Sequence, residues 1–437
     1  MLFKIISKFF AKNKFFSITV LYGVLSLLGM LALSYYWLPP GYAIVGHDSG
    51  LPLDACTFLK SRFYAWDDRL DFGLDNSVNF GSITIHFFDW LAATIARVPY
   101  AGNFLSPFFW LGLIFVSALF FAYQFKNLLG KPFVFILPVF LTFNFYIFQS
   151  VFMLERGKFG VFSATLIALG VYFRLQENKL RLVNAALISA LAFTIFNGGG
   201  LFALTLFGGV GLIFGTFFLL ELIRGFSTHD FKDFNKTASF ILLTAFFFFC
   251  FNAYAYLPYL THFFEDATVE LFRESLYRGN LEWLRYVSRP VSFLNLFRFL
   301  GVPEWYGSYS DFDKANMAHP YASIYLNNRL FSSLSFIFPI LAFLSFIFAK
   351  DGKQRKVISL FGVVALLGAV FAAGSHAPLG FFYEFLMRHV PGFVLFRSAF
   401  YKFDVFYIFA TAVLVAFAIN YLIEKVASFL PAKFDKI

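Results

Sequence analysis

Charged residues are scarce in this chain: Asp, Glu, Lys and Arg make up 14% of the 437 residues, against about 25% in an ordinary soluble domain. The two cysteines, Cys56 and Cys250, fit no metal-binding spacing and do not suggest a disulfide. The chain also lacks a Gly-rich phosphate loop, a fixed-period repeat and a low-complexity linker. With 59% hydrophobic residues, the composition predicts a single integral-membrane domain over residues 1–437.

Long apolar runs recur along the whole chain. About 20 apolar residues cross a bilayer, so we count runs of about 16 or more as candidate spans. Ten such runs occur, at 16–38, 105–125, 132–152, 160–176, 182–197, 201–223, 237–257, 330–349, 357–374 and 404–423. A further run at 83–98 is marginal and carries His86, Asp89 and Arg97, which favours an amphipathic helix at the membrane interface. The sequence predicts an all-α polytopic protein with about ten transmembrane helices.

The basic residues predict the orientation of these spans, because short cytoplasmic loops collect Lys and Arg. With the N-terminus inside, every inner segment is basic: Lys4, Lys8, Lys12 and Lys14; Lys126 and Lys131; Arg174, Lys179 and Arg181; Arg224, Lys232 and Lys236; Lys350, Lys353, Arg355 and Lys356; Lys425, Lys433 and Lys436. The first run is too long for a signal peptide, so we expect it to remain as an anchor. This pattern predicts a multi-pass protein of the cell (plasma) membrane with both termini in the cytoplasm.

The net charge of +10 is explained by these inner segments, which face anionic lipid and follow the rules of membrane insertion. It therefore gives no reason to expect a nucleic-acid partner. The 71 phenylalanines are interpreted in the same way, as bulk that faces membrane lipid.

Three long segments are predicted on the outer face, at 39–104, 258–329 and 375–403. Segments between spans are usually short, so long ones are functional or disordered. The first alternates Phe, Tyr and Trp with Asp and Arg, which argues against disorder. Three large segments on one face predict a binding or reaction site just above the hydrocarbon.

Two carboxylates of the first outer loop are candidates for a catalytic base. Asp48 lies in a turn-rich stretch close to the first span, and Asp54 lies where a helix with Pro52 in its first turn is expected. Each has two interpretations: a general base that takes a proton from a hydroxyl nucleophile, or a carboxylate that stabilises a turn or a helix end. A divalent cation stays open at Asp67, Asp68, Asp71 and Asp75, but their spacing favours a solvated acidic loop.

Basic side chains on the predicted outer face form the second half of the pattern. Arg156 and Lys158 lie between two spans, and Arg388, Arg397 and Lys402 precede the last span. Outer loops disfavour such charges. A phosphate group held at the membrane surface would explain them. Pairing with Asp or Glu on neighbouring loops would explain them equally well.

Taken together, one span, an outer loop with an early Asp and juxtamembrane helices, and then a multi-span bundle resemble the integral-membrane glycosyltransferases of the C-type fold, the GT-C superfamily. Within it, the stretch HAPLGFFYEFLMRHVPGFVLFRSAFYKF at 376–403 is similar to bacterial alpha-(1->3)-arabinofuranosyltransferase-like proteins, in its Pro-Gly-Phe, Phe-Arg and Lys-Phe steps.

The resemblance implies an inverting transferase of the cell envelope. Such enzymes pass a sugar from a polyprenyl-phosphate donor to a hydroxyl of a glycan, lipid or protein acceptor, with a first-loop Asp as base. Asp48 matches that position best and Asp54 is the alternate. The donor phosphate would be bound by the outer basic residues Arg156, Lys158, Arg388, Arg397 and Lys402. No cofactor is implied, although a divalent cation stays open. The transition state should be oxocarbenium-like, with a leaving phosphate that cations stabilise.

Two other classes of function remain open from the sequence. A transporter or flippase for a lipid-linked saccharide would place ionisable residues near span centres and would break its helices in pairs. A non-catalytic membrane scaffold could keep the same architecture. The discriminating observation is whether Asp48 and the outer Arg residues line one cavity.

Overall fold

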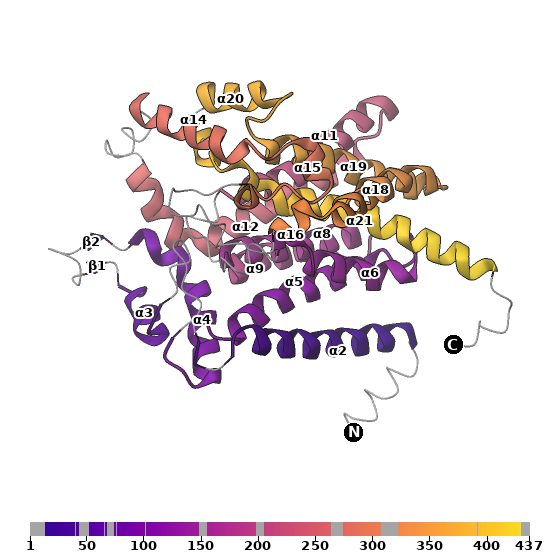
Figure 1. Cartoon of the computed structure of the whole chain (residues 1–437). Helices are drawn as coiled ribbons and strands as arrows, with labels where there is room; N and C mark the ends of the chain where they lie inside the picture. The colour runs from indigo at the N-terminus through magenta and orange to yellow at the C-terminus, as the bar shows by residue number, and fades with distance from the viewer. Residues whose placement is uncertain are drawn as a thin grey trace.

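The computed structural model describes residues 14–39, 41–42, 52–64, 66–67, 74–75, 77–100, 102–147, 155–197, 205–263, 274–306, 322–390 and 392–429. These residues form a bundle of α-helices (Figure 1). The described strands are the two-residue elements β1 (Trp66–Asp67) and β2 (Leu74–Asp75), which pair antiparallel. The predicted class, an all-α polytopic membrane protein, is confirmed at this level.

Eight helical segments of the described chain are long and apolar enough to cross a membrane. They are α2 (Lys14–Trp37), α5 (Leu105–Gln124), α8 (Arg156–Gln176), α11 (Phe207–Thr228), α12 (Lys232–Phe263), α17 (Arg329–Leu334) continued by α18 (Ile337–Phe348), α19 (Gly352–Ala373) and α21 (Ala399–Phe429). All eight coincide with predicted spans. The two other predicted spans, 132–152 and 182–197, fall on shorter apolar helices, α6 (Lys131–Thr142) and α9 (Leu182–Asn197).

Helix α6 ends early for a local reason. The amide nitrogen of Asn144 donates to the carbonyls of Phe140 and Leu141, and its oxygen accepts from the N–H groups of Tyr146 and Ile147. An Asn side chain that bonds its neighbouring backbone competes with the helical ladder. The helix stops at Thr142.

Shorter elements occupy the connections. They are α3 (Ala55–Ser61), η1 (Ser77–Ser82), α4 (Ile83–Ala96), α14 (Glu274–Ser288), α15 (Phe293–Phe297), η2 (Pro303–Trp305), α16 (Ala322–Asn327), α20 (Gly380–His389) and η4 (Phe393–Phe396). Helix α4 covers the run at 83–98 for which an interfacial helix was predicted.

Helix α21 forms the centre of the bundle. Every residue from Phe403 to Ala418 on it is buried, and a helix that is apolar all round belongs inside a protein. It packs most extensively against α19, where Gly368 lets the two backbones approach: a Cβ at Gly368 would lie 3.0 Å from the Cα of Tyr407. Small residues serve this purpose between membrane helices. Helix α2, by contrast, buries few residues and lies along one edge of the bundle (Figure 1).

The bundle has two distinct ends. Helices α3 and α4 lie at one end, while α2 begins and α21 finishes at the other (Figure 1). Helix α21 connects the two, because Asp404 lies near its start and Asn420 about 24 Å further along its axis, at about 1.5 Å per residue. We call these the α3 end and the Asn420 end.

Candidate functional site

Four charged side chains are almost fully buried near the α3 end. Asp89 of α4 and Asp404 of α21 are each 1% exposed, and Lys158 and Arg156 in the first turn of α8 are 4% and 8% exposed. Charged groups are almost never this buried unless they are paired, because removing a charge from water is costly. Each of these four side chains is therefore expected to have a partner of opposite charge.

The first buried pair joins α4 to α8. Asp89 Oδ2 accepts from Arg156 Nη1 and lies 3.3 Å from His86 Nδ1, one turn away on α4. Burial lowers the pKa of His86, and the bond to Asp89 opposes that shift. A neutral imidazole with its proton on Nδ1 donates to the carboxylate. The other oxygen, Asp89 Oδ1, is buried and accepts no hydrogen bond from the described residues. Asp89 Oδ1 is therefore a buried acceptor to which a ligand can donate a hydrogen bond.

Helix α3 of the first loop packs against this pair. The Phe58 ring meets the His86 imidazole edge-on, with centroids 4.7 Å apart. The Arg62 guanidinium also contacts this ring, 4.3 Å from the Phe58 centroid. The Ala55 N–H donates to the Pro99 carbonyl at 2.8 Å, which fixes the start of α3 to the chain that follows α4. The first loop is thus joined directly to the buried charges.

The second buried pair joins α8 to α21. Lys158 Nζ lies 2.7 Å from Asp404 Oδ2 and 3.1 Å from Glu155 Oε2. Asp404 Oδ1 accepts from the Val405 N–H at 2.7 Å, so both of its oxygens are engaged. The Glu155 side chain is 31% exposed and connects the buried pair to the surface. Half-buried Lys402 lies within electrostatic range of all three.

The two pairs meet in the first turn of α8 and form one group. We call it the charge cluster, and it consists of His86, Asp89, Glu155, Arg156, Lys158, Lys402 and Asp404. With a neutral imidazole, its carboxylates and cations balance in number. The cluster is therefore electrically neutral as a whole, and the charge that would be available to a ligand depends on which cations are already paired.

Of the two candidate bases, Asp48 lies outside the described residues. Asp54 is the N-cap of α3: its carboxylate is fully exposed and accepts from the Thr57 N–H, the Thr57 hydroxyl and the Cys56 N–H at 2.7–3.0 Å. These hydrogen bonds, those from Thr57 first, lower the pKa of Asp54. The helix begins at Ala55, three residues after Pro52, because the Asp54 side chain supplies the cap. The helix-end interpretation of Asp54 is therefore what the structure shows.

The acidic run is only partly visible. Asp67 and Asp75 lie in β1 and β2 without described side chains, and Asp68 and Asp71 fall outside the described residues. Within the described part of the chain, no three acidic, His or Cys side chains are placed to hold a metal ion.

The predicted phosphate-binding residues have different partners. Arg156 and Lys158 are paired with carboxylates, which is the second of their two predicted explanations. Arg397 Nη1 donates to Asn280 Oδ1 at 2.8 Å and lies within electrostatic range of Lys402. Arg388 lies 3.5 Å from Glu384, within an exposed network on α14 and α20. The structure thus brings Arg156, Lys158 and Lys402 together, places Arg397 beside them and Arg388 in another group.

Sequence reasoning missed the acidic members of the cluster. Asp89 was interpreted only as a mark of an interfacial helix, and Asp404 was counted as the first residue of a span. The signal was present, since an ionisable residue inside an apolar run is a candidate functional residue. What the sequence did not show is that Asp89 and Asp404 both meet the same turn of α8.

Comparison of the chain with protein-family models, with curated proteins and with solved structures gave no match.

Proposed function

We propose that the chain is an integral-membrane glycosyltransferase of the C-type fold. It transfers a sugar, with inversion, from a polyprenyl-phosphate donor to a hydroxyl acceptor on the outer face of the plasma membrane, in cell-envelope assembly. The observation that supports this best is the charge cluster. A buried salt bridge adds little stability. Several buried charges gathered at one end of a membrane bundle, against the first loop, therefore favour a functional site over a purely structural role.

The proposed orientation places the α3 end outside. Helices α6 and α9 complete ten spans, and both chain ends are then cytoplasmic. Basic residues Lys126, Lys131, Lys350 and Lys425 lie toward the Asn420 end, as inner loops require. Cysteine labelling tests this: a cysteine at 313 should react from outside, and one at 353 only after permeabilisation. The opposite pattern at either position would reverse the orientation.

Lys402 and Arg397 are the best candidates for the donor phosphate. Within the described part of the chain, neither has a carboxylate oxygen within 4.0 Å, whereas Arg156, Lys158 and Arg388 do. A cation that is already neutralised attracts an anion less than an unpaired one. We therefore assign direct phosphate contact to Lys402 and Arg397. Arg156 and Lys158 hold the ends of α4, α8 and α21 together beside the phosphate. Arg388, which pairs with Glu384 in another group, is assigned no direct contact with the phosphate.

Asp48 is the proposed general base, by the resemblance and by its place in the first loop. Replacing a general base costs about 10²- to 10⁴-fold in rate. Asp48→Asn should therefore abolish transfer from a polyprenyl-phosphate sugar in proteoliposomes, measured by mass spectrometry of the product. Asp54→Asn is the matched control, because Asn also caps helices well and Asp54 already serves that role. Full transfer by Asp48→Asn would remove Asp48 from the reaction, and activity lost only in Asp54→Asn would reverse the roles.

A transporter or flippase for a lipid-linked saccharide is the second candidate. The buried Lys158–Asp404 pair favours it, because ionisable pairs inside helix bundles often mark the paths of transported solutes. The same proteoliposomes separate the two functions. A flippase moves a labelled lipid-linked saccharide across the bilayer without changing its mass, whereas a transferase changes the mass of donor and acceptor.

A further inference from the structure

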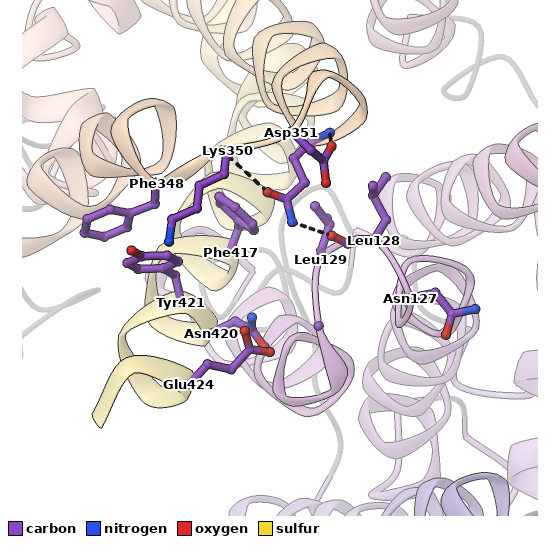
Figure 2. Close-up of a pocket in the computed structure, with 12 residues that line it drawn as sticks. Asn127, Leu128, Leu129, Phe348, Lys350, Asp351, Phe417, Asn420, Tyr421 and Glu424 are labelled. Carbon is purple, nitrogen blue, oxygen red and sulfur yellow. Dashed lines mark hydrogen bonds between the residues drawn. The ribbon is translucent and has the colours of Figure 1, made fainter. Parts of the chain in front are cut away.

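A second polar site lies at the Asn420 end, far from the charge cluster. Three parts of the chain surround a hollow of about 380 Å³: residues 127–130 between α5 and α6, residues 348–354 between α18 and α19, and residues 417–424 of α21 (Figure 2). Neither the sequence pattern nor the proposed transferase accounts for it.

Side-chain bonds connect these three parts. Gln354 Nε2 donates to the Leu128 carbonyl at 2.9 Å, and Gln354 Oε1 accepts from the Lys350 N–H at 3.2 Å. Asp351 caps α19 by accepting from the Gln354 N–H at 2.7 Å. Asn420 Oδ1 accepts from the N–H of Phe133, near the start of α6, at 3.1 Å. The walls of the hollow are therefore held by specific bonds and not by loose loops.

Gly130 fixes how closely two of these walls approach. Its φ of +101° lies in a region that other residues rarely adopt. A Cβ at this position would overlap the Asn420 amide and would lie 2.5 Å from Glu424 Oε1. A glycine is required here so that Asn420 and Glu424 can face the hollow against bare backbone.

Three polar groups at the hollow are left without strong partners. Asn420 is 2% exposed as a residue, and the described residues offer its Nδ2 no acceptor. The exposed Glu424 carboxylate has no ion pair among them either. The Lys350 ammonium lies 5.1 Å from the Tyr421 ring centroid, and that ring stacks on Phe348 at 4.3 Å. Figure 2 shows these side chains around one space.

The neighbouring surface is apolar and exposed. Ile347 precedes Phe348 of the hollow on α18, and Ile347 and Phe343 are 62% and 68% exposed. Such a surface on a membrane bundle faces acyl chains. An occupant that meets both regions must join apolar chains to a headgroup with charges of both signs.

We propose that this hollow binds the headgroup of a phospholipid with a primary amine, such as phosphatidylethanolamine. The ammonium donates to Glu424, and the phosphate accepts from Asn420 Nδ2 and from Lys350, which supplies a point charge. A choline headgroup has no N–H to donate, and a glycerol headgroup has no cation. The acyl chains lie along α18, in the inner leaflet if the proposed orientation holds.

The experiment compares lipids retained by the full chain. The protein is reconstituted into equal parts of phosphatidylethanolamine, phosphatidylcholine and phosphatidylglycerol, and the bound lipid is counted by native mass spectrometry. Wild type should retain phosphatidylethanolamine preferentially. Glu424→Gln should reduce that preference about fivefold, the effect of one exposed charge pair. Lys350→Gln should reduce retention of all three lipids, since each carries a phosphate.

Glu177→Gln is the matched control. Glu177 is a 52% exposed carboxylate that follows α8, at the Asn420 end of the bundle, and it does not line the hollow. This variant should keep the wild-type preference. An unchanged preference in Glu424→Gln, or an equal loss in Glu177→Gln, would overturn the proposal. Competition by soluble glycerophosphoethanolamine at equal concentration would overturn the lipid as occupant. Lys350→Gln keeps the test available should Glu424→Gln fail to fold. Sugar transfer is not the readout, so the result is independent of the proposed transferase.

Discussion

Removing one partner of the Lys158–Asp404 pair should destabilise the protein far more than removing both. The two charges lie 2.7 Å apart with side chains 3% and 1% exposed. Their attraction is about 6 kcal/mol at an effective dielectric of about 20. Desolvation costs several kcal/mol per ion, so the net contribution of the pair is close to zero.

The single and double variants separate these opposing effects. Asp404→Leu leaves a buried ammonium and should cost about 3–5 kcal/mol in free energy of unfolding. The loss should fall at the lower end of that range, because Glu155 remains 3.1 Å from Lys158 Nζ. Lys158→Met leaves Asp404 as an unpaired buried carboxylate and should cost a similar amount. The double variant removes both charges and should be within about 1 kcal/mol of wild type.

Unfolding of the four proteins in detergent, followed by tryptophan fluorescence, gives the coupling energy of the pair. A double variant that loses the sum of the two single losses would refute the reasoning, because independent sites add. Sugar transfer measured on the same samples then separates folding from function. A double variant that is stable but inactive would show that the reaction needs these charges.

Arg397→Ala should weaken binding of the polyprenyl-phosphate donor at unchanged expression and melting temperature, and an unchanged affinity would remove Arg397 from the site. Gly209→Ala should lower the melting temperature, because its Cβ would overlap a phenyl ring of α21, whereas Gly211→Ala, with nothing within 4 Å, should not. Hydrogen bonds from Arg285 lower the pKa of Glu384 below its ordinary 4.5. This contribution to stability is present above pH 4.5 and lost as the pH falls through the lowered pKa. Glu384→Gln should therefore melt slightly lower than wild type at neutral pH, and the difference should disappear in acid.

The helices were predictable from the sequence for a local reason. A membrane span is a helix because its backbone can bond only to itself in lipid, and it needs about 20 apolar residues because the hydrocarbon core is about 30 Å thick. Eight of the predicted runs coincide with long helices. The start of α3 was missed by a few residues, because Asp54 caps the helix that Pro52 was expected to begin. The shortness of α6 depends on the bonds of one side chain, Asn144, which run length does not register.

The charge cluster could not be predicted because its bonds join distant parts of the chain. Arg156 follows Asp89 by 67 residues, and Asp404 follows Lys158 by 246. Apolar run length places each helix in the membrane but does not say which helix ends meet. The cluster depends on α4, α8 and α21 meeting at one end of the bundle, and that follows from packing around α21.

The pairing within the cluster also decides how an anionic ligand would be received. A phosphate that displaced Asp89 from Arg156, or Asp404 from Lys158, would leave a buried carboxylate without its cation, at about the cost of breaking a buried pair. Lys402 and Arg397 have no such carboxylate to displace among the described residues. A phosphate bound by these two therefore gains their attraction and leaves the buried pairs intact. For this reason the proposed phosphate contact is assigned to Lys402 and Arg397, while the paired charges fix the helix ends.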